Sequence, residues 1–119
     1  MRIIYNKIIP FGRNFHAINL FGVLFAKGTC SERVINHEAI HTAQIIENAG
    51  VFFYIFYILE WLVRLIQYGS FMKAYRNISF EREAFYNDKD FNYLKTRKFW
   101  NFLKYMRKSN FEQYKTTKL

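Results

Sequence analysis

The first thirty residues hold short runs of β-branched and aromatic side chains rather than the three-to-four spacing of a helix. The stretch RIIYNKIIPF, residues 2–11, reaches the only proline, Pro10, and predicts a short strand followed by a turn. The stretch FHAINLFGVLFAK, residues 15–27, has the same character. Gly22 inside it predicts a strand with a kink or a close backbone approach. The stretch KGTCSE, residues 27–32, then ends the strand pattern.

Residues 31–50, SERVINHEAIHTAQIIENAG, change to helical periodicity. Thr29 with Glu32 three residues later forms a capping-box pattern, and Ser31 is an alternative N-cap. Gly50 fits the position of a C-cap. The apolar side of this predicted helix is made by Val34, Ile35, Ala39, Ile45 and Ile46.

Residues 51–69, VFFYIFYILEWLVRLIQYG, form the most apolar stretch of the chain. A membrane-spanning helix needs about 20 mostly apolar residues, whereas the uncharged portion here runs only from residue 48 to residue 59. Glu60 and Arg64 follow, four positions apart, and can pair on one helix face. These features favour a helix in the core of the protein. Attachment of the helix to a membrane interface is the alternative.

The remaining sequence predicts a connector at residues 70–78, a short helix within residues 79–94 and a last amphipathic helix within residues 97–108. Ser79 is the expected N-cap of the first of these helices. One side of the second is formed by Phe99, Phe102, Leu103 and Met106. Two strands followed by four helices define an α+β class, and we expect residues 1–119 to form one domain.

The net charge of +9 is concentrated near the C-terminus, since residues 95–119 carry eight basic side chains and one acidic side chain. We interpret this segment as a solvated helix and tail, with contact to an anionic membrane or nucleic acid as the alternative. No nucleic-acid-binding motif accompanies it. Cys30 is the only cysteine, which excludes an internal disulfide. The first ten residues do not have the pattern of a signal peptide, so we expect a cytoplasmic location, with membrane association as the alternative.

The hexapeptide NHEAIH, residues 36–41, contains two of the three histidines. Positions i and i+4 share a helix face, so His37 and His41 can both reach one ion. Zinc prefers nitrogen, sulfur or oxygen ligands at about 2.0–2.3 Å. Glu38 points away from the ligand axis, where it can hold a metal-bound water and accept its proton. This is the chemistry of the H-E-x-x-H motif, and we expect zinc as the cofactor.

A catalytic zinc site usually has three protein ligands and one open position. The third histidine is His16, and Cys30 lies at the wrong end of the motif helix. Glu60 lies in the apolar stretch, where an ion pair with Arg64 is its alternative role. Glu81 lies in the first turn of the next predicted helix, which presents it to the ion if the two helices pack together. The candidate third ligands are therefore Glu60, Glu81 and Glu83.

The motif HEAIH, followed downstream by FEREAF at residues 80–85, resembles the gluzincin clan of zinc metallopeptidases. In that clan the third ligand is the first glutamate of an E-x-x-A-like stretch on a later helix, which assigns the role to Glu81. The small size resembles the minimal single-domain members called minigluzincins. The pattern NHE-IH--Q--E … AYR-ISFEREA also resembles a group of small uncharacterised bacterial proteins. The resemblance covers residues 16–90 and implies a zincin-like fold.

The resemblance also implies roles around the ligands. Zincins generally add a tyrosine or histidine that stabilises the oxyanion, and the candidates are Tyr75, Tyr86 and His16. The acidic residue expected after the alanine is Phe85 here. The carboxylate that usually lies behind a ligand therefore comes from Asp88 or Glu83.

Two neighbouring segments complete the expected site. In the clan an edge strand above the site aligns the substrate backbone, and NLFGVLFA, residues 19–26, resembles that strand by position. Gln44 and Glu47 follow His41 on the motif helix. They are partners of the ligands or part of a solvated helix face, and we favour the solvated face.

The sequence therefore supports three hypotheses. The first is a zinc-dependent metallopeptidase that cleaves peptide or protein substrates by a zinc-bound water with Glu38 as general base. The second is a zinc-binding protein that is inactive or latent. The third is a membrane-surface protein, suggested by residues 51–68 and the basic tail. The oligomeric state cannot be inferred from the sequence.

Overall fold

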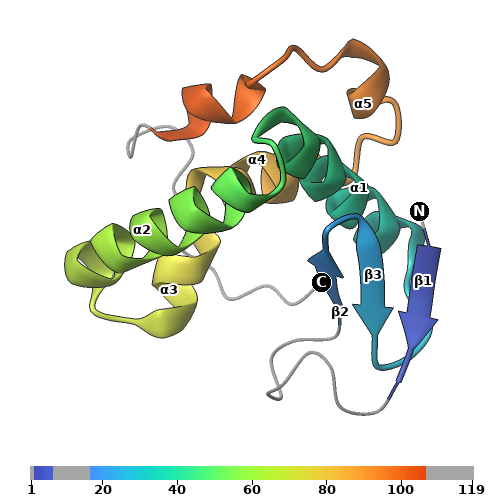
Figure 1. Ribbon diagram of the computed structural model, residues 1–119, viewed down its shortest axis with the longest axis horizontal. Coiled ribbons are helices and arrows are strands. Elements are labelled where there is room, and N and C mark those ends of the chain that lie inside the picture. Colours follow the sequence, from blue (N-terminus) through green and yellow to red (C-terminus); the bar gives the residue numbers. More distant parts are fainter. Residues whose placement is uncertain (1, 7–16, 107–119) are drawn as a thin grey trace.

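A computed structural model of the protein describes residues 2–6 and 17–106 and has an α+β architecture, as predicted. A small sheet lies at one end and a mainly helical body at the other (Figure 1). The strands are β1 (Arg2–Tyr5), β2 (Ala17–Leu20) and β3 (Val23–Ala26). The helices are α1 (Glu32–Glu47), α2 (Val51–Tyr68), α3 (Phe71–Arg76), α4 (Ser79–Asn87), α5 (Tyr93–Thr96) and the 3₁₀ helix η1 (Asn101–Met106).

The sheet has the strand order β1-β3-β2, with β1 parallel and β2 antiparallel to β3. The prediction of one kinked strand over residues 15–27 is wrong, because β2 and β3 form a hairpin. Phe21 and Gly22 make its two-residue turn with φ values of 51° and 86°, and a positive φ at both positions suits the right-handed twist of the strands. The Phe21 backbone N–H donates to the Tyr54 hydroxyl at 2.8 Å, and the two rings pack at 4.7 Å. This contact helps to hold an unfavourable conformation at Phe21.

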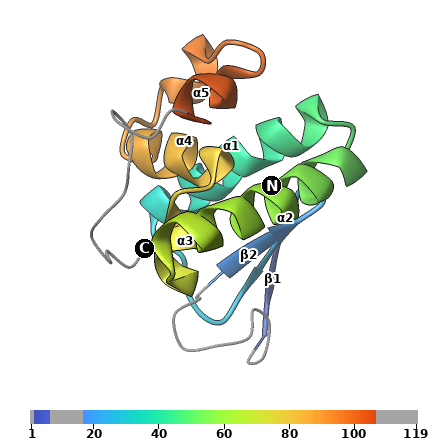
Figure 2. The same cartoon turned by 90° about the vertical axis from the view of Figure 1, so that its left-hand side faces the viewer.

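The predicted motif helix is confirmed as α1. Ser31 is its N-cap and accepts a hydrogen bond from the backbone N–H of Val34 at 3.2 Å. The predicted C-cap is wrong: Asn48 ends the helix, and Gly50 with φ of 70° precedes α2. Helix α1 lies between the sheet and α4 (Figure 2). It is therefore held from both sides.

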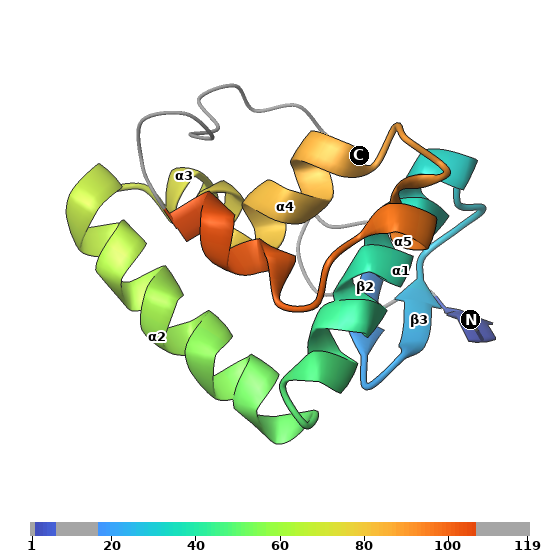
Figure 3. The ribbon, with the colours of Figure 1, turned by 90° about the horizontal axis from the view of Figure 1, so that it is seen from above.

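Helix α2 forms where predicted, and the Glu60–Arg64 pair is present at 3.2 Å. The prediction that it is a core helix is wrong, because only 11% of its residues are buried. Figure 3 shows α1 and α2 as two arms diverging from residues 48–50, with α4 and η1 between them. Within residues 2–6 and 17–106, neighbouring elements thus cover only one side of α2. By length and composition alone, α2 could cross a membrane.

The start of α4 differs from the prediction. Ile78, not Ser79, is the N-cap residue, and its side chain makes no capping bond. The Glu60 carboxylate performs this function from α2, since it accepts from the Ser79 backbone N–H at 2.7 Å and from its hydroxyl at 2.6 Å. The predicted connector contains α3, whose N-cap Ser70 accepts from the Lys73 backbone N–H. A side chain nineteen residues away has replaced the local cap of α4.

The last predicted helix is shorter than expected, and among the described residues it is the 3₁₀ helix η1. Phe102 and Tyr105 are buried, whereas Phe99, Leu103 and Met106 are exposed, so its expected apolar side is divided. Residues 107–119 of the predicted basic tail lie outside the described residues. Phe102 joins the main core cluster, whose other members are Ile45, Phe53, Ile78 and Phe80.

Candidate metal centre

Two buried imidazoles and one carboxylate meet where α1 packs against α4. His37 and His41 lie one turn apart on α1 and are 0% and 5% exposed. Their Nε2 atoms are 3.2 Å apart. Glu81, in the first turn of α4, places Oε1 at 3.1 Å from Nε2 of His37 and at 3.0 Å from Nε2 of His41. The structure thus brings together the two histidines and the carboxylate that the resemblance selected.

The opposite ring nitrogens are held by separate acceptors. Nδ1 of His37 lies 3.0 Å from Oδ2 of Asp88, and Nδ1 of His41 lies 2.7 Å from Oε1 of Gln44. The Gln44 amide nitrogen donates to Phe80 O and to Glu83, which fixes its orientation. Because both partners accept, each Nδ1 carries a proton, which leaves Nε2 of each imidazole to face Glu81. The solvated role favoured for Gln44 is wrong, since α4 covers it.

Three acceptor atoms this close together require a cation between them. A proton on His41 can act as this cation when no metal is bound. Burial lowers the pKa of His41, but the charge of Glu81 and its hydrogen bond outweigh this and raise that pKa to about 10. Burial alone would raise the pKa of Glu81, but His41 and His37 hold it well below its usual value. The cluster is therefore organised around positive charge.

The geometry of this cluster fits a tetrahedral metal. With Zn–N bonds of about 2.0–2.1 Å, neighbouring ligand atoms in a tetrahedron lie about 3.3 Å apart. The three observed separations are 3.2, 3.1 and 3.0 Å. Two imidazoles and a carboxylate are also a known ligand set of catalytic zinc. The residues present fit the ion without large rearrangement.

Glu38 lies beside the cluster, and its ligand atom is within 4.8 Å of those of His37 and His41. By this distance alone it competes with Glu81 as third ligand. Its Oε2 is nevertheless 4.0 Å from Nε2 of His37, about 1 Å farther than the Glu81 oxygen. Burial raises the pKa of the Glu38 carboxyl, and the two imidazoles offset this only in part. Its position and proton affinity suit a base better than a ligand.

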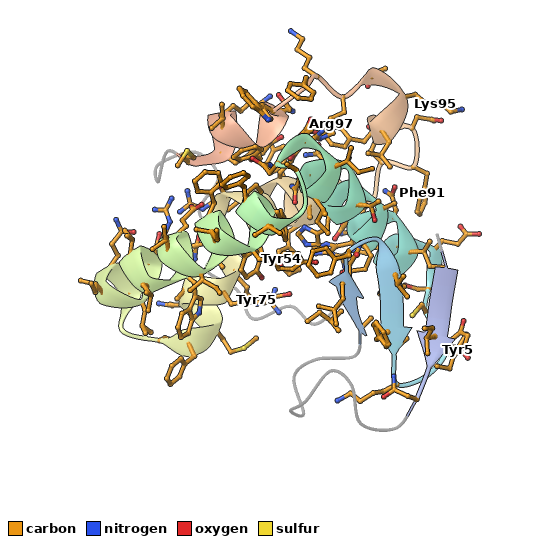
Figure 4. All side chains as sticks on the ribbon, viewed as in Figure 1. Tyr5, Tyr54, Tyr75, Phe91, Lys95 and Arg97 are labelled. Atoms are coloured by element: carbon orange, nitrogen blue, oxygen red, sulfur yellow. The ribbon has the colours of Figure 1, made fainter. Side chains whose placement is uncertain are left out.

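Two tyrosines lie at the Glu81 carboxylate. The Tyr57 hydroxyl, from α2, donates to Oε2 of Glu81 at 2.6 Å. Tyr75 also hydrogen-bonds Glu81, and its pKa is raised well above the usual value by burial and by the charges of Glu81 and Glu38. Figure 4 shows Tyr75 in the space between α2 and the sheet. Tyr75 was a sequence candidate, whereas Tyr57 was not, because its position in an apolar helix gave no indication of this contact.

The other sequence candidates lie elsewhere. Glu60 binds Ser79 and Arg64, so its role as a third ligand is wrong and the alternative ion pair is confirmed. Glu83 binds Arg97 at 2.6 Å and does not face the imidazoles. Tyr86 is 60% exposed and its ring packs against Tyr105, so it does not reach the buried cluster. His16 lies outside the described residues.

A buried ion network supports the site from behind. Arg97 binds Glu47 at 2.6 Å and Glu83 at 2.6 Å, and all three side chains are at most 6% exposed. Glu83 in turn contacts the Gln44 amide that holds His41. The solvated face favoured for Glu47 is therefore wrong. Figure 4 places Arg97 beside the C-terminal end of α1.

Replacing Arg97 with alanine should destabilise the protein by about 3–5 kcal/mol, because two buried carboxylates then lose their counter-charge. Urea unfolding followed by circular dichroism measures this change. Lys98→Ala, at an exposed neighbouring position, is the matched control and should stay within about 0.5 kcal/mol of the wild type. A loss below about 1 kcal/mol for Arg97→Ala would mean that the network is not a structural support.

Together, the fold and the cluster define a small α+β protein with a buried site of two histidines and one carboxylate. The chain matches no protein-family model, and it has no significant match among curated proteins or solved structures. The function of the protein must therefore be inferred from the chemistry of this chain's own residues.

Proposed function

We propose that this protein is a zinc-dependent metallopeptidase of the gluzincin type, with a zincin-like fold. One observation carries the proposal. Nε2 of His37, Nε2 of His41 and Oε1 of Glu81 converge within 3.0–3.2 Å of one another, while each imidazole is oriented by an acceptor on its other nitrogen. Such orienting partners are the usual surroundings of metal-binding histidines. Asp88 and Gln44 take that role here.

The chain's own residues supply the remaining chemistry. When bound, zinc supplies Lewis-acid activation of water and of the substrate carbonyl. Glu38 accepts the proton of the attacking water on its carboxylate and passes it to the leaving amine. The Tyr75 hydroxyl donates to the developing oxyanion. Both side chains lie close enough to Glu81 that, besides burial, its charge raises their pKa values, which supports placing the base and the oxyanion donor at one site.

An edge strand is available to align the substrate. Strand β2 lies at the edge of the sheet, as its order β1-β3-β2 requires. Asn19 on β2 donates from Nδ2 to the backbone carbonyl of Glu38 at 2.8 Å, which fixes the strand against the motif helix. The outer edge of β2, where the Asn19 carbonyl accepts from the Tyr54 hydroxyl at 3.4 Å, can pair with an extended peptide backbone that displaces this contact. This arrangement supports a peptide rather than a small-molecule substrate.

A second candidate function is a zinc-binding protein that is inactive or latent. It is favoured by the burial of the site, since His37, Glu38, His41 and Glu81 are at most 5% exposed. A peptide must displace part of this cover to reach Glu38. Zinc-loaded protein that cleaves neither unfolded proteins nor short peptides would support this candidate over the first.

Adding zinc to the metal-free protein should raise the melting temperature by about 10 °C or more, because the folded state alone offers the assembled site. Zinc at about 1,000 times its dissociation constant contributes about 4 kcal/mol, and each kcal/mol corresponds to about 4 °C in a domain of this size. Differential scanning fluorimetry with a chelator measures this effect. Magnesium is the control, since it prefers oxygen ligands. No shift with zinc, cobalt or nickel would contradict the proposal.

A further inference from the structure

The outward side of α2 is apolar along nearly its whole length. Nine large side chains on this helix are between 44% and 87% exposed, and no charged residue of α2 is among the exposed ones. They present on the order of 1,000 Å² of apolar surface, well above the largest patch on a typical monomer, which is about 300–600 Å². We call these residues the outer face: Val51, Phe52, Ile55, Phe56, Ile58, Leu59, Leu62, Val63 and Ile66.

The distribution of polarity on α2 is the reverse of that in a water-soluble surface helix. At about 100° per residue, the outer face covers a continuous arc of about 160°. Glu60 and Arg64 lie on the opposite side and turn inward, where Arg64 is 5% exposed. A soluble surface helix directs such charges outward. A lipid-facing helix directs them toward the protein, as α2 does.

The outer face continues onto η1. A groove of about 550 Å³ runs between the two helices, and Leu103 and Met106 form its far wall. Figure 3 shows η1 alongside α2. Two basic side chains of the segment that leads into and through η1, Lys98 and Lys104, are exposed. Trp100, also exposed, adds a side chain that is enriched at membrane interfaces.

We propose that the outer face of α2, together with η1, docks this protein onto an anionic lipid membrane. An apolar face beside a cationic segment is the combination that binds such surfaces. A second copy of the chain fits less well, because each copy carries a net charge of +9 and their basic segments would be brought together.

Helix α2 lies in the plane of the interface and does not cross the membrane. A crossing would carry α3 and η1, which pack along the same helix, into the hydrocarbon. Both expose charge, at Lys73 and Lys104. Charged side chains at that depth are costly unless paired. The in-plane orientation leaves both lysines at the level of the headgroups.

This inference is independent of the proposed peptidase activity. It does place the candidate metal centre at a definite depth relative to the membrane surface. Tyr57 lies on the inner side of α2 and binds Glu81. The centre is therefore about one helix diameter, on the order of 10 Å, from the docked surface.

Flotation of the full chain with vesicles tests the docking. We expect binding to phosphatidylcholine vesicles containing about one third phosphatidylglycerol, and much weaker binding to phosphatidylcholine alone. Leu59→Gln with Ile66→Gln should reduce the partition constant at least about tenfold, because both side chains then no longer insert. Lys98→Gln with Lys104→Gln should reduce it about fivefold per lysine on the anionic vesicles only.

The matched control is Tyr5→Gln with Phe91→Gln. These side chains are 58% and 55% exposed and lie at the opposite end of the molecule from α2 (Figure 4). The control should bind like the wild type. Wild-type protein that stays with neither vesicle, or outer-face variants that bind unchanged, would overturn the inference. So would a dimer in light scattering that Leu59→Gln with Ile66→Gln dissociates while vesicles capture neither protein.

Discussion

Replacing Glu81 with alanine is expected to weaken zinc binding on the order of a hundredfold. Its Oε1 atom lies 3.0–3.1 Å from Nε2 of both imidazoles, about 1 Å closer to Nε2 of His37 than the Glu38 oxygen. Four-ligand zinc sites in small peptides bind with about 10–16 kcal/mol, or about 3 kcal/mol per ligand. Loss of one ligand therefore weakens binding on the order of a hundredfold. Elemental analysis of the purified variant, followed by zinc titration with a competing chelator, measures this change.

Two further variants make the result for Glu81 specific. Glu81→Gln keeps the shape of the side chain but removes its charge, so it should also bind zinc more weakly while retaining the fold. Glu32→Ala removes an equal charge from an exposed position in the first turn of α1 and should bind zinc normally. Unchanged zinc affinity in both Glu81 variants would show that Glu38 is the third ligand.

The positions of the central residues were predictable because each depends on local geometry. The i, i+4 spacing places His37 and His41 on one face of any helix that forms there, and Ser31 starts that helix. The contribution of Glu81 was predicted from a resemblance rather than from spacing. Metal binding itself stays a prediction.

The partners behind these residues depend on packing between distant segments. Gln44 looks like a solvated position until α4 covers it and its amide meets Phe80 and Glu83. Tyr57 has no local pattern that distinguishes it from the other aromatic residues of α2. The tertiary arrangement of α2 and α4 brings its hydroxyl to Glu81. Side-chain partners separated by 24 to 39 residues cannot be read from periodicity.

The errors in the fold have the same origin. Phe21 is an unusual residue for a hairpin turn with positive φ, and a hydrogen bond and ring contact with Tyr54 stabilise it there. Ser79 has the composition of an N-cap, but Glu60 binds its backbone and hydroxyl from α2. The apolar character of residues 51–69 was correctly identified. Sequence alone did not indicate that most of these side chains face away from the protein.

Replacing Glu38 with glutamine is expected to leave zinc bound and to lower kcat at least about a hundredfold. A positioned general base contributes about 10²–10⁴ in rate, and an amide cannot accept the proton of the attacking water. The zinc content should be unchanged, because the Glu38 carboxylate is 4.0 Å from Nε2 of His37 and the Glu81 oxygen is nearer. Cleavage of an unfolded protein substrate, measured with metal analysis of the same sample, tests both parts.

Zinc content and cleavage, measured together, separate the role of Glu38 from that of Glu81. If Glu38→Gln loses zinc, Glu38 is a ligand and the general base lies elsewhere. If it keeps zinc and still cleaves, the assigned base is wrong. Glu32→Gln, which makes the same chemical change at an exposed position of the same helix, should retain both zinc and cleavage. Only retained zinc with lost cleavage fits a carboxylate that lies beside the metal without binding it.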